Sequence, residues 1–247
     1  MNLDKNRNQI ILHIPHSSTE IPFYDGYNID LIDFQTNLLV DHATDKIFRI
    51  SDVEALIFPY NRIFCDVERL DDEHEVLFEK GRGFFYTKTD DNQDLRMVIP
   101  EIKTKVKSMF YDTHHRKLEE MVDERLKNYS SAIIIDCHSF TNEPFDSDID
   151  KSPYRPDICL GTDKFHTPKW LIDHFEKYFI NNGFSVKIDS PYSGTIVPLK
   201  HYNKDNRVLS IMIEINRKLY MDNFEVIDNQ VVNLQKLIFN SLEIIRE

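Results

Sequence analysis

The 247-residue chain has little glycine and cysteine, and this excludes two common kinds of site. Its six glycines form no GxGxxG or Walker pattern, so the usual phosphate-binding loops of nucleotide enzymes are ruled out. The three cysteines, Cys65, Cys137 and Cys159, form no CxxC or zinc-finger spacing, and each lies in an apolar run. We expect buried, reduced thiols. Any metal ion must therefore be held by histidine and carboxylate side chains.

Long apolar runs and an excess of basic residues are also missing. No stretch approaches the roughly 18 apolar residues of a membrane helix, and the N-terminal apolar segment is too short for a signal peptide. The 42 acidic and 30 basic side chains give a formal charge of −12, which argues against nucleic acid as a partner. We expect a soluble cytoplasmic protein that binds neither nucleic acid nor membrane. An anionic substrate would need local positive charge from arginine or a metal ion.

Apolar segments of two kinds alternate along the chain and predict its fold class. Short runs rich in β-branched residues are typical of buried strands, and longer stretches with helical spacing separate them. This order favours a three-layer α/β/α fold around a mixed, mostly parallel sheet. Strands are expected at 9–15, 54–60, 62–67, 131–137, 157–161, 184–189 and 207–215, and helices at 30–50, 101–127, 168–182 and 224–245.

Three chemically capable side chains lie at the ends of predicted strands. His16 follows the strand at 9–15, while His138 and Glu214 lie at the ends of two strongly apolar strands. Ligands of α/β folds bind beyond the carboxyl ends of the strands, so these side chains are expected to meet. Two imidazoles and one carboxylate, with a fourth position for water, form the usual catalytic zinc arrangement. Glu214 can also be interpreted as the partner of a nearby arginine.

The third metal ligand has two candidates that spacing does not separate. Glu20 lies four residues after His16, in a pattern that also suits a capping box. Asp41 lies inside the predicted helix 30–50, where an acidic residue usually faces solvent. Asp136 alternates with His138 along its strand and is expected to orient an imidazole, and Asp66 follows the same logic.

The positions of further arginines and histidines in the predicted elements indicate roles for them. Arg62 and Arg69 flank the predicted strand 62–67, and their odd spacing places them on opposite faces of it. One arginine is expected to polarise a substrate carbonyl and the other to bind a carboxylate. The adjacent His114 and His115 lie in a charged predicted helix and are expected at the surface. His201 follows a Pro- and Gly-containing turn and is expected to contact substrate.

Seven segments of the chain resemble, in the same order, the N-formylglutamate amidohydrolase family. They are HIPHSSTEIP at 13–22, LLVDHATDKIF at 38–48, NRIFCDVER at 61–69, GFFYT at 83–87, IIIDCHSF at 133–140, SPYSGTIVPLKHY at 190–202 and IMIEINRKLYM at 211–221. The resemblance implies a single catalytic domain over 1–247 with a zinc-carboxypeptidase-like fold. It also implies that His16, His138 and Asp41 hold one zinc ion, or another divalent ion, with Glu214 as general base.

The family resemblance further implies a reaction and a substrate. The reaction is hydrolysis of a linear amide C–N bond in a small, anionic N-acyl amino acid, such as N-formyl-L-glutamate, which gives formate and L-glutamate. Alternatives are a carboxypeptidase- or amidase-like hydrolase of peptides or cell-wall fragments, and a non-catalytic binding protein on the same fold. Arg62 is expected to act in catalysis, and the residues expected to bind substrate are Arg69, Ser139, Tyr192, Gly194, His201 and Arg217.

The chain departs from the family pattern in two places. Residues 193–195 read Ser-Gly-Thr where family members tend to carry two glycines, and Glu68 occupies a position that is usually Asn. An extra acidic group close to a site for an acidic substrate is electrostatically unfavourable.

Overall fold

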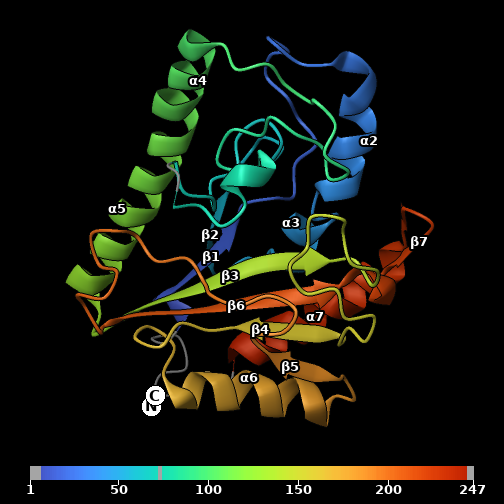
Figure 1. Ribbon diagram of the computed structural model, residues 1–247. Helices are drawn as coiled ribbons and strands as arrows, with labels where there is room; N and C mark the ends of the chain where they lie inside the picture. Colours follow the sequence, from blue (N-terminus) through green and yellow to red (C-terminus); the bar gives the residue numbers. More distant parts are fainter. Residues whose placement is uncertain (1–6, 72–73, 244–247) are drawn as a thin grey trace.

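The computed structural model describes residues 7–71 and 74–243, which form a three-layer α/β arrangement (Figure 1). The central sheet contains β1 (Ile10–Ile14), β2 (Glu54–Ile57), β3 (Ala132–Phe140), β4 (Ile158–Gly161), β5 (Val186–Ile188) and β6 (Val208–Asn216). The α-helices are α2 (Ile29–Leu39), α3 (Thr44–Ile47), α4 (Pro100–Val106), α5 (Asp112–Asn128), α6 (Lys169–Asn181) and α7 (Asp228–Glu243). The predicted fold class is confirmed.

The order of strands in the sheet is β2-β1-β3-β6-β4-β5. Strands β2, β1, β3 and β6 run parallel, β4 is antiparallel to β6, and β5 is parallel to β4. The register places His13 beside Asp136 and His138 beside Glu214. The carboxyl ends of β1, β3 and β6 therefore share one edge of the sheet, as the sequence predicted.

The two faces of the sheet are covered by different helices. Alternate residues of β1, β3 and β6, such as Leu12, Ile135 and Ile213, pack with α3, α6 and α7. The intervening residues face α5, where Ile134 contacts the cluster around Leu118. Because side chains alternate along a strand, Asp136, His138, Met212 and Glu214 point to the α5 side. The polar residues at the strand ends therefore open toward that side of the sheet.

A second hydrophobic cluster lies above the sheet in the orientation of Figure 1. It is formed by segments between residues 21 and 106, including α2, the end of α4 and the turns around Phe64 and Tyr86. Arg96 lies within this cluster, 3.7 Å from the ring centroid of Phe85 and 4.4 Å from that of Tyr27. This region and the sheet edge enclose the site described below.

Two secondary-structure predictions were wrong in ways that matter for the site. Residues 62–67 form turns and not a strand, with Phe64 N and Cys65 N both donating to the carbonyl of Asn61. The predicted helix 30–50 is broken after Leu39, so Asp41 lies in the turn before α3 and not on a helix face. Val40, with an extended ψ of 140°, ends α2, and Ala43, with a φ of 58°, precedes α3.

The remaining differences are smaller. The predicted helix 101–127 is continuous, but a π-helical segment, Lys107–Tyr111, joins α4 to α5. The predicted helix 224–245 begins only at Asp228, after the short hairpin β7 (Met221–Asp222) and β8 (Glu225–Val226), and residues 244 and 245 lie outside the described part. All three cysteines are buried and free, as expected. In the described part of the chain, no helix is long and apolar enough to cross a membrane.

Candidate active site

A cavity of about 530 Å³ lies beyond the carboxyl ends of β1, β3 and β6. Most of the side chains predicted for the site line it, and they are His16, Asp41, Arg62, Arg69, His138, Ser139, Tyr192, Gly194, Glu214 and Arg217. His201 does not line it and instead contacts Asp123 through Nε2 at 2.9 Å, so its predicted contact with substrate is not supported. Glu20 is exposed and also lies outside the lining.

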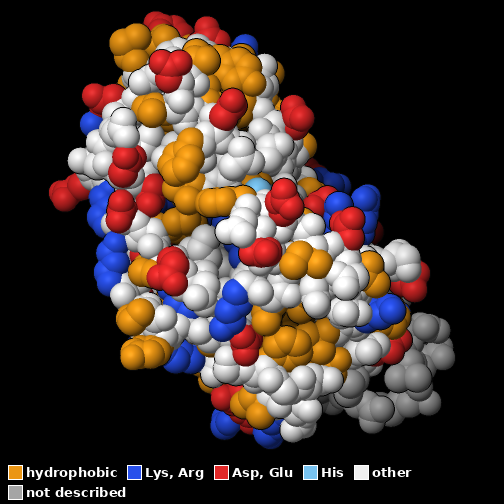
Figure 2. Space-filling model, turned by 90° about the vertical axis from the view of Figure 1, so that its right-hand side faces the viewer, with side chains coloured by type: hydrophobic (Ala, Val, Ile, Leu, Met, Phe, Trp, Pro, Cys, Tyr) orange, Lys and Arg blue, Asp and Glu red, His pale blue; other side chains and the backbone are white. Residues whose placement is uncertain are grey.

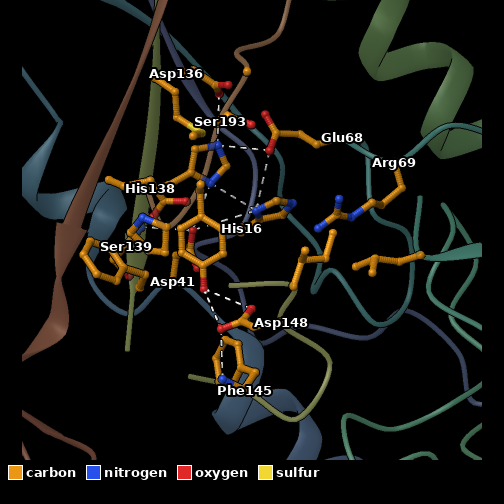
Figure 3. Close-up of a pocket in the computed structure, with 18 of the residues that line it drawn as sticks. His16, Asp41, Glu68, Arg69, Asp136, His138, Ser139, Phe145, Asp148 and Ser193 are labelled. Carbon is orange, nitrogen blue, oxygen red and sulfur yellow. Dashed lines mark hydrogen bonds and ion pairs between the residues drawn. The ribbon is translucent and has the colours of Figure 1, made fainter. Parts of the chain in front are cut away.

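The imidazoles of His16 and His138 face one another in this cavity (Figure 3). Their Nδ1 atoms are 3.3 Å apart, and both side chains are almost completely buried. Each far nitrogen is held by a buried carboxylate: Nε2 of His16 lies 2.9 Å from Asp66, and Nε2 of His138 lies 3.1 Å from Asp136. A proton on each Nε2 leaves two Nδ1 lone pairs pointing at each other, an arrangement that favours a cation between them.

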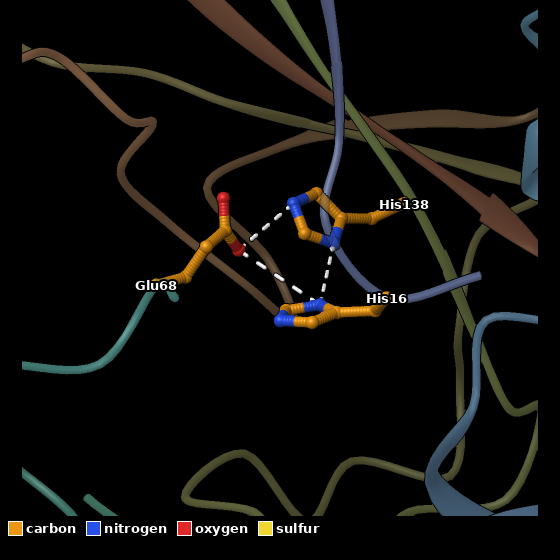
Figure 4. Close-up of side chains that lie close together, drawn as sticks. All are labelled: His16, Glu68 and His138. Carbon is orange, nitrogen blue, oxygen red and sulfur yellow. Dashed lines mark hydrogen bonds and ion pairs between the residues drawn. The ribbon is translucent and has the colours of Figure 1, made fainter. Parts of the chain in front are cut away.

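Two carboxylates lie close enough to complete a metal site with these histidines. Asp41 Oδ2 is 3.1 Å from His138 Nδ1 and 3.8 Å from His16 Nδ1. Glu68 also groups with both histidines (Figure 4), with Oε2 3.9 Å from His16 Nδ1 but 3.0 Å from His138 Nε2. Ligand atoms around a tetrahedral zinc are about 3.3 Å apart. Asp41 fits better, because it faces the same nitrogen of His138 that faces His16.

Nearby positive charges and hydrogen bonds keep the carboxylates of Asp66 and Asp41 ionised despite their burial. Burial raises the pKa of Asp66, but Arg62 and His16 outweigh it, so the pKa lies well below its ordinary value. Asp66 Oδ2 accepts from Arg62 Nε and Nη2 at 3.1 and 2.9 Å, and from Tyr86 at 2.8 Å. The pKa of Asp41 is likewise lowered, because hydrogen bonds to His138 and His16 outweigh its burial.

Glu214 has the surroundings of a proton acceptor. It lies on β6 directly beside His138 and is 8% exposed. Its Oε2 is buried with no hydrogen-bond partner among the described residues. Burial raises the pKa of Glu214 to about 8, although His138 and the arginines nearby lower it. The interpretation of Glu214 as the ion-pair partner of Arg217 does not fit, because Arg217 binds other groups.

Two of the three predicted arginines, Arg217 and Arg62, are hydrogen-bonded to protein groups. Arg217 donates to Ser139, to the Leu38 carbonyl and to Asp41 Oδ1, so it holds protein groups in place and is not free for substrate. Arg62 donates hydrogen bonds from Nε and Nη2 to Asp66, and its Nη1 lies 4.0 Å from Asp41. The predicted separation of Arg62 and Arg69 on opposite strand faces is wrong, since both line the same cavity.

Several hydrogen-bonding groups of the cavity wall that were expected to bind substrate are already bonded to protein groups. Tyr192 OH contacts Arg155 at 3.0 Å and Asp148 at 3.0 Å, and the Ile196 N–H donates to Asp136 and not to a ligand. Ser139 accepts from Arg217, and its backbone N–H donates to Asp41 at 3.2 Å. These contacts fix the wall of the site.

The prediction that His114 and His115 lie at the surface was wrong, since His114 is buried and His115 is half-buried. The Nε2 atom of His114 is 2.8 Å from Nε2 of His13, and His114 is 6% exposed. His13 is fully buried, and its Nδ1 is 2.9 Å from Asp136. Burial lowers the pKa of His13, but the nearby carboxylates of Asp136 and Glu68 raise it to about 9. A chain of buried polar groups thus runs from α5 through β1 to β3.

Comparisons with known proteins agree with this fold. The N-formylglutamate amidohydrolase family matches residues 8–221. The chain belongs to this family. A crystal structure of N-formylglutamate amidohydrolase from Ralstonia eutropha JMP134 has a TM-score of 0.79 at 20% identity, covering 95% of this chain and 93% of that one. A gene product from Agrobacterium tumefaciens gives a TM-score of 0.66 at 15% identity, covering 98% and 93%. No curated protein matches the chain.

Sequence reasoning placed Glu68 near the site but gave it no role in binding. Glu68 is separated from Asp66 by the same two positions as Asp136 from His138. This spacing was the signal in the sequence that could have identified Glu68 as a site residue. Only the structure shows the turn that carries these residues, where Asp66 contacts His16, Glu68 contacts His138, and Arg69 lines the same cavity as Glu68 (Figure 3).

Proposed function

We propose that this member of the family is a metal-dependent amidohydrolase that cleaves the amide C–N bond of a small N-acyl amino acid. The observation that carries the proposal is the pair of Nδ1 atoms 3.3 Å apart, each on a ring whose other nitrogen contacts a buried carboxylate. Such carboxylate–histidine pairs are the usual support of metal-binding imidazoles.

His16, His138 and Asp41 are the residues we propose to hold one divalent ion, with zinc the first candidate. A zinc ion bound there would lower the pKa of a water molecule to about 7. Arg217 and the Ser139 backbone fix the Asp41 carboxylate, which supports a preformed set of donors. Imidazole and carboxylate donors suit several divalent ions, so the metal must be identified by measurement.

Glu214 is the proposed general base. Its unpartnered Oε2 is available to take a proton from water and to return it to the leaving nitrogen. Arg62, with Nη1 not bonded to Asp66, is proposed to stabilise the negative charge that develops on the amide oxygen. A non-catalytic binding protein would have no use for a buried, unpaired carboxylate at this place, so the enzyme is favoured over that alternative.

N-formyl-L-glutamate is the first substrate to test, because the family and one structural neighbour carry its name. Hydrolysis of peptides or cell-wall fragments by the same groups is the second candidate. The enclosing loops favour a small molecule, since Asp90 binds the backbone of Asp146 and Ser147, and Tyr192 binds Asp148. These contacts hold Ser147 and Asp148 in the cavity wall, and the cavity volume of about 530 Å³ suits a small ligand.

The test is metal analysis combined with a formate-release assay on four variants. We expect wild type to hold about one equivalent of metal, and His138→Ala to hold little. Glu214→Gln should retain metal and lose at least about 100-fold in kcat. Asp41→Asn should weaken metal binding more than Glu68→Gln does. Wild type without metal under metal-replete conditions would refute the proposal, and the reverse order for the last two variants would make Glu68 the ligand.

A further inference from the structure

Two adjacent residues of the cavity wall, Glu68 and Arg69, each have a buried polar atom without a hydrogen-bond partner among the described residues. In Glu68 this atom is Oε1, and in Arg69 it is Nε. Both side chains line the cavity and come from the same turn (Figure 3). Buried polar atoms are nearly always hydrogen-bonded, so two unpaired atoms in one cavity indicate groups that a ligand satisfies.

The Oε1 atom of Glu68 makes a long ionic contact but accepts no hydrogen bond from the described residues. Oε2 lies 3.0 Å from His138 Nε2, which Asp136 also contacts at 3.1 Å. Oε1 lies 3.4 Å from His13 Nδ1, whose shorter contact is with Asp136 at 2.9 Å. The Glu68 carboxylate lines the cavity, and its Oε1 therefore remains available to a hydrogen-bond donor.

The positive charge that offsets this carboxylate is limited. Arg217 and Arg62 bind Asp41 and Asp66. Arg69 is less engaged, with contacts of 3.5 Å to Glu75 and 3.9 Å to Asp66, and its side chain is 30% exposed. One substrate carboxylate can be accommodated by Arg69, whereas a second one would lie beside Glu68 without a cation of its own. On the face drawn in Figure 2, acidic and basic side chains are interspersed.

We propose that Glu68 determines substrate charge, so that the site takes an N-acyl amino acid with one carboxylate and a hydrogen-bond-donating side chain in preference to a dianion. The carboxylate binds at Arg69, and an amide or ammonium group donates to Glu68 Oε1. This inference rests on the proposed amidohydrolase activity. A site that pairs a buried acceptor with a substrate donor rejects analogues without the donor, and like charge adds to the discrimination.

The test compares N-formyl-L-glutamine with N-formyl-L-glutamate, which differ only by an NH2 group in place of a carboxylate oxygen. For wild type we expect kcat/KM to favour the glutamine derivative at least tenfold, which corresponds to about 1.4 kcal/mol. Glu68→Gln should shift this ratio at least tenfold toward the glutamate derivative and retain its metal. Glu20→Gln is the matched control, because Glu20 is exposed outside the cavity, and it should leave the ratio unchanged.

Binding is measured separately so that the two proposals fail separately. Calorimetric titration of both compounds into Glu214→Gln, with and without Glu68→Gln, gives the ratio of Kd values without turnover. If neither compound is hydrolysed but the Kd ratio shifts as expected, the proposed reaction fails and the charge selection holds. A wild-type preference for the glutamate derivative, an unchanged ratio in Glu68→Gln, loss of metal in that variant, or no binding of either compound would each overturn the charge selection.

Discussion

Replacing Asp66 by Asn tests whether the buried carboxylate behind His16 supports metal binding. Asp66 is fully buried and lies 2.9 Å from His16 Nε2. The asparagine side chain keeps the size but loses the charge, and its NH2 group can face the imidazole and favour the wrong tautomer. Loss of such a partner typically weakens metal binding by 10- to 100-fold, or about 1.4 to 2.7 kcal/mol.

The same substitution also affects folding, because Arg62 loses its counter-charge. Arg62 donates two hydrogen bonds to Asp66 Oδ2, and its side chain is 13% exposed. Breaking a buried pair by removing one partner costs about 3 kcal/mol or more. Asp205→Asn is the matched control, since it removes an exposed pair with Arg207 and should cost less than about 1 kcal/mol.

The assay for Asp66→Asn combines competitive chelator titration for the metal Kd with urea unfolding of the metal-free protein. Asp136→Asn is the second variant, because Asp136 supports His138 in the same way. If either variant folds and its metal Kd stays within twofold of wild type, the reasoning that assigns these carboxylates to the metal site is refuted. A loss of metal affinity in Asp205→Asn of the same size would show that the effect is not specific.

Three further predictions concern folding. Gly161→Ala should destabilise the protein by about 1 to 3 kcal/mol in urea unfolding, because the added Cβ would lie 2.3 Å from the Gly194 carbonyl oxygen; an unchanged midpoint contradicts this. His114→Phe should cost about 1 to 3 kcal/mol by leaving His13 Nε2 unpaired, and equal stability would show that another group replaces the contact. The pKa of Asp66 is well below its ordinary 3.8, so its stabilising contribution is present above pH 3.8 and is lost as the pH falls further. Unfolding free energies of Asp66→Asn should accordingly fall less steeply than those of wild type below pH 4.

Local patterns in the sequence were sufficient to locate the strands of the sheet but not their order within it. The runs ending in His16, His138 and Glu214 are apolar enough to identify buried strands, and the carboxyl ends of parallel strands meet at one edge. This rule brought the three side chains together without any coordinates. The alternation along β3 also placed Asp136 beside His138, which the 3.1 Å contact confirms.

The errors arose where turns and long-range packing determine the conformation. The segment around Arg62 has the composition of a strand, but Asn61 caps a turn there with its side-chain and main-chain oxygens. At the break before Asp41, Arg217 donates hydrogen bonds to Leu38 and Asp41 from a position 176 residues after Asp41. His114 looked solvated because its helix is charged, yet it faces His13 on the sheet. None of these long-range contacts is visible within one segment.

The sequence by itself determined the sheet, the residues at its functional edge and the restriction of any metal site to histidine and carboxylate donors. These follow from hydrophobic periodicity and from the residue types present, which are local properties. Only the tertiary structure decided which carboxylates face the histidines, which arginines are already bonded and that Glu68 leaves an unpaired oxygen in the cavity. Those outcomes depend on contacts between turns far apart in the chain. Asp41 and Glu68, for example, differ in which ring nitrogen of His138 they face.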